Sequence, residues 1–371
     1  MSSEALAAHR FFVSRLLDWY GAKKRDLPWR RTRDPYAILV SEMMLQQTQV
    51  ATVIPFFERW MRRFPTLASL AEAPLDDVLK HWQGLGYYAR ARNLQNAARR
   101  IVERHDGVFP TMFTDVLALP GIGRYTAGAV CSIAFDSDVP IVDANVVRVL
   151  CRYFGIRGDP KTPGVQRRLW ELAEELVPAG RASAFNQGMM ELGALVCDAK
   201  PTCGVCPVRP ECRAYRNGTV DTLPEFAPRP AFTKQTDVSA IIGHPSGDGR
   251  LLLVRRPVGG LWAGLYEFPR VTAIPEESLT DAAVRAGREV VGMATSPAEV
   301  VASVRHGVTT RKITLYAVAC RPQAGAEPTA VGCDSWVWVT LEEIERYALA
   351  SPQVRLASQL TGAVQQPSLF G

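Results

Sequence analysis

The first 220 residues carry the hydrophobic spacing of amphipathic helices. Apolar side chains recur every three or four positions in residues 5–20, and again over 35–63, where Pro55 is expected to break or kink the helix. The same spacing, with Gly or Pro at most junctions, predicts further helices near 66–71, 75–83, 87–105, 113–118, 124–135, 143–154, 163–177 and 181–197. No convincing strand pattern precedes residue 237, so residues 1–220 are predicted to form an all-α domain.

A different pattern follows. Residues 221–236 contain three prolines and little periodicity, which is typical of an inter-domain linker. After them come short β-like runs and one helical stretch, at 238–242, 251–255, 279–291 (the helix), 313–320 and 336–340. We therefore expect a multidomain chain, with an α+β domain at 237–360 and a polar, flexible tail at 361–371.

Composition and charge narrow the class of protein. The chain has 371 residues, 47% of them hydrophobic and 22% charged, which is ordinary for a globular protein of two domains. Its apolar runs are shorter than the roughly 18 residues of a membrane span, and its first residues lack a signal pattern. We expect a cytoplasmic protein with no membrane partner.

Residues 1–220 carry 29 Lys and Arg against 22 Asp and Glu, and 24 of the 29 are Arg. This balance fits a phosphate-rich partner, or simply solvated helix faces.

A glycine-rich turn precedes one of the predicted helices. In Leu119–Val130, Gly121 and Gly123 flank one apolar residue, and small residues follow. Such a turn can aim backbone N–H groups at an anion, or can merely join two packed helices. About twenty residues later Asp143 lies in an apolar run, Val139–Asn145. An interpretation of the chain has to account for the glycine-rich turn and for this aspartate together.

Four of the eight cysteines are clustered. Their spacing is C-x5-C-x2-C-x5-C within sixteen residues: Cys197, Cys203, Cys206 and Cys212. A reducing compartment disfavours disulfides. Four thiolates so close together can ligate a [4Fe–4S] cluster. A structural zinc ion is the alternative, although zinc sites usually separate their two cysteine pairs by a dozen or more residues.

The turn, the aspartate and the cysteines, in this order, resemble the endonuclease III superfamily of DNA glycosylases. Two further runs, Ser41–Val50 and Gly84–Asn93, resemble its adenine DNA glycosylase (MutY) family, whose members remove adenine mispaired with 8-oxoguanine. The similarity runs from about residue 25 to 216 and continues weakly through a Nudix-like domain. It implies a helix–hairpin–helix domain with a [4Fe–4S] loop. It also implies a monomeric, nucleoid-associated repair enzyme that acts on duplex DNA with A:8-oxoguanine or A:G mispairs.

The resemblance also implies catalytic roles. Glu42 would protonate adenine N7, and burial beside methionines would favour its protonated form. Asp143 would stay ionised and stabilise or briefly bond the oxocarbenium carbon, with Asn145 in the same site. Tyr125 would assist Asp143. It stands where strand-cleaving relatives carry a Schiff-base lysine, so we expect base removal without lyase activity.

Contacts to DNA and to the base are implied in the same way. An adenine inside a duplex must be flipped out and its gap filled. The resemblance gives that role to Gln47 and Tyr87, with Leu85 nearby, and gives phosphate binding to Gly121 and Gly123. The adenine pocket would comprise Leu27, Trp29, Arg30, Gln187 and Met190, and Arg30 would also contact DNA. Several of these residues could equally be packing residues.

The Nudix-like domain raises the alternative of nucleotide pyrophosphate hydrolysis. That reaction needs a metal-binding R-E-x-x-E-E helix, and the matching run, Arg288–Met293, lacks the last two glutamates. We therefore expect this domain to read 8-oxoguanine, through the run that contains His306, Val308, Thr309 and Thr310.

Two other functions stay open. One is a bifunctional glycosylase and AP lyase for oxidised pyrimidines, which a lysine at position 125 would favour. The other is a non-catalytic lesion-binding protein, against which the presence of both Glu42 and Asp143 argues.

Overall fold

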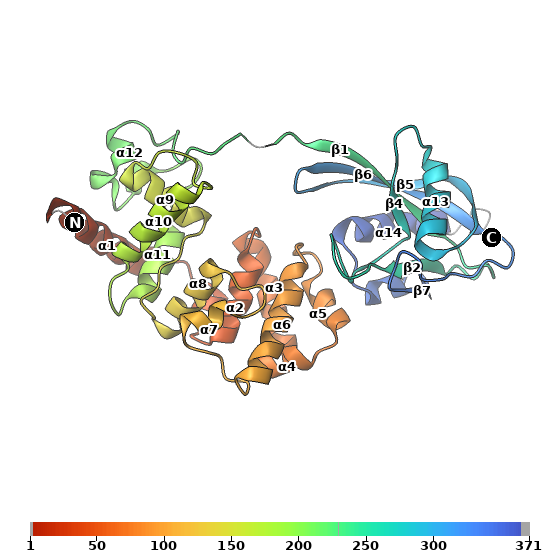
Figure 1. The fold of residues 1–371 in the computed structure, drawn as a ribbon, viewed down its shortest axis with the longest axis horizontal. Helices are drawn as coiled ribbons and strands as arrows, with labels where there is room; N and C mark the ends of the chain where they lie inside the picture. The colour runs from red at the N-terminus through yellow and green to blue at the C-terminus, as the bar shows by residue number, and fades with distance from the viewer. Residues whose placement is uncertain (1–2, 229, 365–371) are drawn as a thin grey trace. The chain divides into compact units, whose positions relative to one another are not determined.

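The computed structural model describes residues 3–228 and 230–364 (Figure 1). The chain divides into two compact units. Unit 1 comprises Met1–Glu72 with Asn93–Pro228, and unit 2 comprises Ala73–Arg92 with Arg229–Gly371. The multidomain architecture predicted from the sequence, helices first and sheets second, is confirmed. Among the residues described, no helix is long and apolar enough to cross a membrane.

The helices up to residue 216 agree in number and place with most of those predicted. They are α1 (Ser3–Lys23), α2 (Pro35–Leu45), α3 (Val50–Arg63), α4 (Leu67–Glu72), α5 (Leu75–Trp82), α6 (Ala89–Arg104), α7 (Phe113–Leu117), α8 (Arg124–Phe135), α9 (Ala144–Phe154), α10 (Pro163–Leu176), α11 (Ala182–Leu195) and α12 (Arg213–Arg216). Short 3-10 helices cover Pro28–Arg30, Cys203–Val205 and Arg209–Glu211.

The single helix predicted over 35–63 is wrong. The chain leaves the helical path after Leu45, and Gln47 has a left-handed backbone with φ of 56°. Pro55, where the break was expected, lies inside α3. Pro55 is the sixth residue of α3, and the helix continues past it to Arg63.

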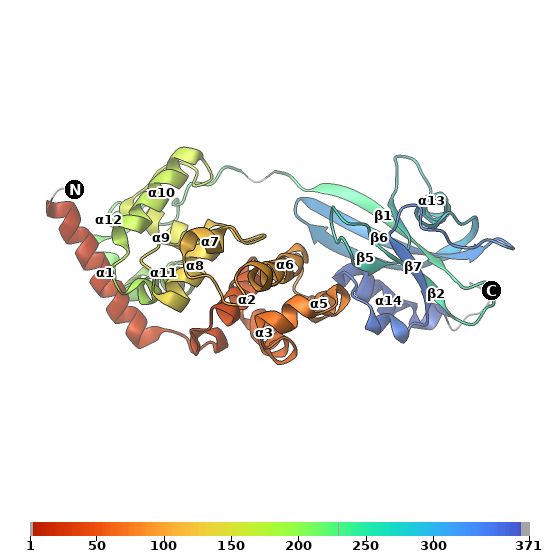
Figure 2. The same ribbon diagram turned by 60° about the horizontal axis from the view of Figure 1, so that its bottom comes forward.

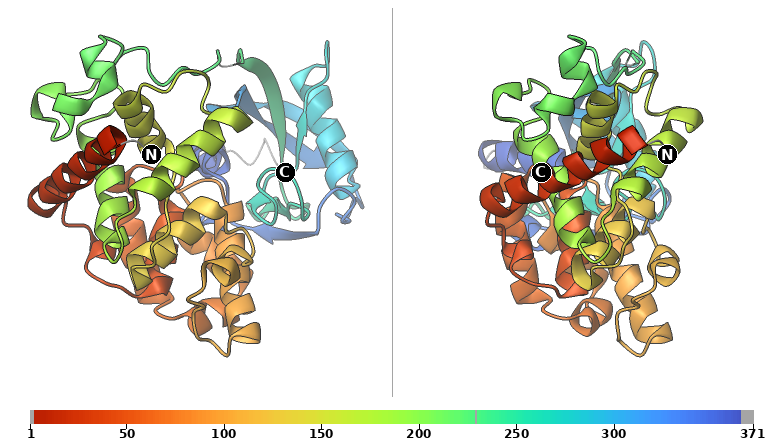
Figure 3. Two further views of the ribbon diagram at one scale, coloured as in Figure 1. Left: turned by 60° about the vertical axis from the view of Figure 1, so that its left-hand side comes forward. Right: turned by 90° about the vertical axis from the view of Figure 1, so that its left-hand side faces the viewer.

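Helix α8 lies at the centre of unit 1. Every residue from Thr126 to Ala134 is buried, and α8 packs against α2 and α11, while α1 packs along α11 (Figures 1 and 3). Small side chains permit this close packing: a Cβ on Gly128 would lie only 2.6 Å from the carbonyl oxygen of Pro140. The arrangement brings side chains of α2, α8 and α11 to one place.

Unit 2 contains two sheets. The first has the order β4 (Arg270–Thr272), β1 (Thr233–Ile242), β6 (Arg311–Pro322), β5 (Thr295–Val308), and only β1 and β6 pair in parallel. The second has the order β3 (Tyr266–Glu267), β2 (Leu251–Arg255), β7 (Ser335–Val339). Helices α13 (Leu279–Val291) and α14 (Ser351–Val364) cover opposite faces of the first sheet (Figure 2). Alternate residues of β1 face one or the other: Ile241 packs with α14, and Ala240 and Ile242 with α13.

Several boundaries in unit 2 differ from those predicted. Strand β1 begins at Thr233, inside the predicted linker, and α14 reaches Val364, inside the predicted tail; residues 365–371 lie outside the described residues. Strand β5 was not predicted, because its buried positions do not alternate regularly and a bulge follows Pro297.

Residues 73–92 were predicted to belong to the helical domain, yet they contact the C-terminal part of the chain within unit 2. The hydroxyl of Tyr88 donates to the carbonyl oxygen of Leu349 at 3.0 Å, and Arg255 forms an ion pair with Asp76 at 2.7 Å. Tyr88 is therefore a core residue of this unit.

Candidate active site

Glu42 is a carboxyl group buried in a helix. It lies in α2 between Ser41 and Met43, and only 4% of its surface is exposed. Its Oε2 accepts a hydrogen bond from the hydroxyl of Tyr125 at 2.6 Å. Burial raises the pKa of Glu42 to about 7, although the hydrogen bond from Tyr125 acts in the opposite direction. A substantial fraction of Glu42 therefore carries a proton at neutral pH.

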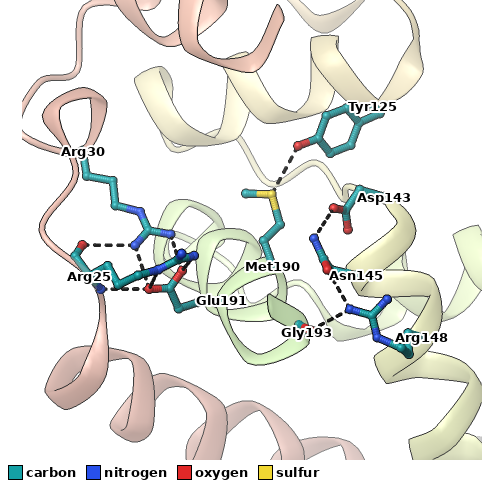
Figure 4. Close-up of polar contacts among 9 residues, drawn as sticks. All are labelled: Arg25, Arg30, Tyr125, Asp143, Asn145, Arg148, Met190, Glu191 and Gly193. Atoms are coloured by element: carbon teal, nitrogen blue, oxygen red, sulfur yellow. Dashed lines mark hydrogen bonds and ion pairs between the residues drawn. The ribbon is translucent and has the colours of Figure 1, made fainter. Parts of the chain in front are cut away.

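Asp143 is a second carboxyl group in a different environment. It caps the N-terminus of α9, where its Oδ1 accepts from the backbone N–H of Val146 at 2.7 Å. Its Oδ2 accepts from the amide of Asn145 at 2.9 Å, and Arg148 donates to Asn145 at 2.8 Å (Figure 4). Burial raises the pKa of Asp143, whereas these hydrogen bonds and the charge of Arg148 favour its ionised form.

Tyr125 connects α8 to the first carboxyl group. Its hydroxyl also lies 3.2 Å from the sulfur of Met190 on α11 (Figure 4). Burial and the nearby carboxylates Glu42 and Asp143 raise the pKa of Tyr125 well above its ordinary value. The phenol therefore stays protonated, and it offers no amine that could form a Schiff base.

One cavity of about 610 Å³ brings the predicted residues together. Its lining includes all four predicted catalytic residues, all five predicted pocket residues (of which Arg30 was also predicted to contact DNA) and one further predicted DNA-binding residue: Glu42, Tyr125, Asp143, Asn145, Leu27, Trp29, Arg30, Gln187, Met190 and Gln47. Leu27 and Trp29 are buried at the short 3-10 helix Pro28–Arg30. The individual roles of these residues stay predictions, but the geometry places them in one site.

Two charged residues that line the cavity, Arg25 and Glu191, were not among those predicted from the sequence. Glu191 on α11 is fully buried and binds the guanidinium groups of both Arg25 and Arg30 at 2.7–3.0 Å (Figure 4). Burial alone would raise the pKa of Glu191, but these hydrogen bonds lower it to about 2. Glu191 adjoins Met190 and lies one helical turn after Gln187, and an acidic residue in this apolar stretch was the available signal.

The other predicted DNA-binding residues do not line this cavity. Gly121 has φ of 70°, and a Cβ there would lie within 2.4 Å of Asn93, so this turn requires glycine. Gly123 has extended backbone and precedes α8, with open space beside it. Leu85 is buried, whereas Tyr87 is 54% exposed.

The predicted lesion-reading residues lie at the β5–β6 hairpin. His306 and Val308 are on β5, opposite Ile313 and Arg311. Thr309 and Thr310 form the turn, and Thr309 has φ of 53°. The four residues are thus close in sequence and follow one hairpin, rather than converging from several elements.

The four clustered cysteines line one cavity beside Arg152. A guanidinium nitrogen of Arg152 lies 3.4 Å from the sulfur of Cys197. Burial, and next the neighbouring Cys197, raise the pKa of Cys203. Within the described ranges, no three His, Cys, Asp or Glu side chains form a group that could hold a single metal ion. Four thiols around one cavity, next to a cation, fit a cluster of several metal ions.

Comparison with known proteins agrees with this geometry. Residues 40–175 match the family model of the HhH-GPD superfamily base excision DNA repair protein, and residues 241–359 match that of the NUDIX domain. The chain is similar to the adenine DNA glycosylase of Rattus norvegicus, with 39% identity over 92% of this chain and 76% of the rat protein. The chain belongs to the adenine DNA glycosylase family. It is therefore a DNA glycosylase, a hydrolase of N-glycosyl bonds in base excision repair.

Other adenine DNA glycosylase relatives extend the comparison. The human adenine DNA glycosylase is 42% identical over 72% of this chain and 59% of its own length. A solved structure of a thermostable thymine-DNA glycosylase has a TM-score of 0.54 and 35% identity, and it covers 57% of this chain and 99% of the other. A non-covalent endonuclease III–DNA complex, at 23% identity and a TM-score of 0.50, shares the fold.

Proposed function

We propose that this glycosylase removes adenine mispaired with 8-oxoguanine or guanine in duplex DNA and leaves the strand intact. The observation that supports this most directly is the cavity in which Glu42, Tyr125 and Asp143 meet, with a hydrogen bond of 2.6 Å between the first two. Two carboxyl groups in different environments are what acid-assisted cleavage of a glycosidic bond requires.

The reaction would begin with protonation of the base. Glu42, with a pKa of about 7, is poised to donate its proton to adenine N7. The bond between C1′ and N9 then breaks, its electrons stay with adenine, and positive charge develops on the sugar. Asp143, bound by Val146 N–H and Asn145, would stabilise that charge until water adds to C1′ and releases a proton.

The flipped adenine would occupy the cavity between Trp29, Arg30 and Gln187. Arg30 is held by Glu191, so its guanidinium has a fixed position at the wall of the pocket. Gln47 and the exposed ring of Tyr87 would fill the gap in the duplex, and the buried Leu85 lies two positions before Tyr87 in the same loop. Gly121 to Gly123 would hold a backbone phosphate.

We further propose that Cys197, Cys203, Cys206 and Cys212 hold a [4Fe–4S] cluster. Such a cluster would cross-link the loop that they form. The reader of 8-oxoguanine would be the β5–β6 hairpin with His306 to Thr310. We expect the protein to act as a monomer associated with the nucleoid.

One assay tests the function. The protein is incubated with duplexes containing A opposite 8-oxoguanine, A opposite C, or thymine glycol, and half of each sample is then treated with alkali. Cleavage of the first duplex, only after alkali, is expected. Strand cleavage without alkali, or cleavage only at thymine glycol, would contradict the proposal.

A further inference from the structure

The loop between α5 and α6 has a strained backbone. Three of the four residues from Gly84 to Tyr87 have positive φ: 110° at Gly84, 71° at Gly86 and 48° at Tyr87. Glycine adopts this region freely, but in tyrosine the Cβ crowds the backbone, which makes the conformation unfavourable. Surrounding groups must therefore hold Tyr87 in it.

Arg90, in the first turn of α6, binds the carbonyl oxygens of this loop. Its Nη2 donates to Leu85 at 3.1 Å and to Gly86 at 3.0 Å, and its Nε donates to Tyr87 at 3.4 Å. The planar guanidinium presents several donors in a fixed arrangement, which the ammonium group of lysine cannot reproduce. Three successive peptide groups are thus oriented by one side chain.

The same side chain lies against two aromatic rings. The guanidinium carbon of Arg90 is 5.2 Å from the ring centre of Trp82 and 5.5 Å from that of Tyr87. The indole N–H of Trp82 also donates to Gly86 at 3.0 Å. Arg90 is 6% exposed and Tyr87 is 54% exposed, so the tyrosine ring faces outward and the arginine lies behind it.

We propose that Arg90 is a positioning residue that fixes Tyr87 in the conformation in which it enters DNA. Arg90 acts through the loop and makes no DNA contact of its own, because its side chain is buried. Holding the loop in advance reduces the ordering that binding would otherwise require. The inference rests on the proposed function, which assigns Tyr87 to the gap left by the flipped base.

The test is a double-mutant cycle of Arg90→Lys and Tyr87→Ala. Affinity is measured for a duplex with a non-cleavable adenosine analogue opposite 8-oxoguanine, and the fluorescence of a 2-aminopurine beside the mispair reports unstacking by the wedge. Each single variant is expected to bind about tenfold more weakly, a usual size for coupled neighbours. The double variant is expected to match Tyr87→Ala, and both Arg90→Lys and Tyr87→Ala should lose the fluorescence change.

Two controls separate positioning from stability. Arg99→Lys makes the same change on the same helix, where Arg99 donates to the carbonyl oxygen of Ala71, and it should bind as the unaltered protein does. Trp82→Phe removes one donor to Gly86 and keeps a ring, so it should show a smaller loss of affinity and of the fluorescence change. This variant replaces Arg90→Lys in the test if Arg90→Lys unfolds at a lower temperature than the unaltered protein.

The possible failures are distinguishable. If Tyr87→Ala binds normally, the wedge role in the proposed function is wrong, and the positioning role falls with it. If Tyr87→Ala binds weakly but Arg90→Lys binds normally, or the two losses simply add, only the positioning role is wrong. An equal loss in Arg99→Lys would also overturn it.

Discussion

The cavity around Glu42 and the β5–β6 hairpin carry the two predicted recognition tasks, and they are built differently. The cavity draws on α2, α8, α9, α11 and a 3-10 helix, and most of its polar side chains are partly buried, with Ser41, Glu42 and Glu191 buried. The hairpin offers neighbouring residues on one pair of strands. Burial shifts the pKa of the groups in the cavity, so it suits bond cleavage. Of the four predicted residues at the hairpin only His306 titrates, and burial lowers its pKa, which favours a neutral imidazole over a proton donor.

The comparison is tested most strongly by removing the carboxyl groups of the cavity. Glu42→Gln should lower the rate of adenine excision by about 10²–10⁴-fold, the usual contribution of a general acid. Asp143→Asn should be comparably inactive, because the charge that faces the sugar is lost while the cap to Val146 can persist. Single-turnover excision measures the loss, and duplex binding is the control. Excision at the unaltered rate in either variant would refute its role.

The pH dependence tests the burial of Glu42 directly. Because its pKa is raised to about 7, its protonated fraction falls above that pH. Single-turnover excision should therefore decrease about tenfold per pH unit on the alkaline side. Protonation of Asp143 would lower the rate on the acidic side. Duplex binding over the same pH range is the control. An excision rate that does not change between pH 6 and pH 9 would show that no group in the cavity acts as this acid.

The same residue should destabilise the fold at high pH. Glu42 binds its proton more tightly in the folded chain than at its ordinary pKa of 4.5, so its contribution to stability is present at low pH and lost as pH rises through about 7. The loss amounts to roughly 3 kcal/mol. Glu42→Gln cannot ionise, so its melting temperature should exceed that of the unaltered protein at pH 8.5 by more than at pH 5. Equal differences at both pH values would contradict the shift.

The sequence allowed the cavity to be predicted better than the hairpin. Glu42, Tyr125 and Asp143 were predicted from the resemblance that their surrounding motifs carry, and the structure brings all three to one cavity. Glu191 was missed because its importance depends on Arg25 and Arg30, more than 160 positions away. The acidic residue in an apolar stretch was the only local signal, and it does not reveal which distant arginines pair with it.

The predicted boundaries of helices and strands were wrong where local sequence signals compete with one another or with tertiary packing. Pro55 is a strong helix breaker, yet the chain turns at Gln47, whose left-handed backbone no propensity predicts. Strand β5 is long but irregular, with a bulge near Pro297, so its alternation is lost in the sequence. The helix α14 was not predicted, and its last four positions fell in the predicted tail, because its burial depends on a sheet formed by residues far from it.

The smallest expected effect is at the hairpin turn. Thr309 is β-branched and has φ of 53°, a conformation that glycine adopts without strain. Thr309→Gly therefore relieves strain in the folded chain but increases the conformational entropy of the unfolded chain. The free energy of unfolding should change by less than about 1 kcal/mol. If its hydroxyl contacts 8-oxoguanine, the preference for A:8-oxoguanine over A:G should fall about three- to tenfold, the value of one hydrogen bond. Thr314→Val, on β6, is the matched control. If both excision rates stay the same, lesion reading lies elsewhere. If both rates fall by the same factor, the hairpin, like the cavity, supports bond cleavage itself.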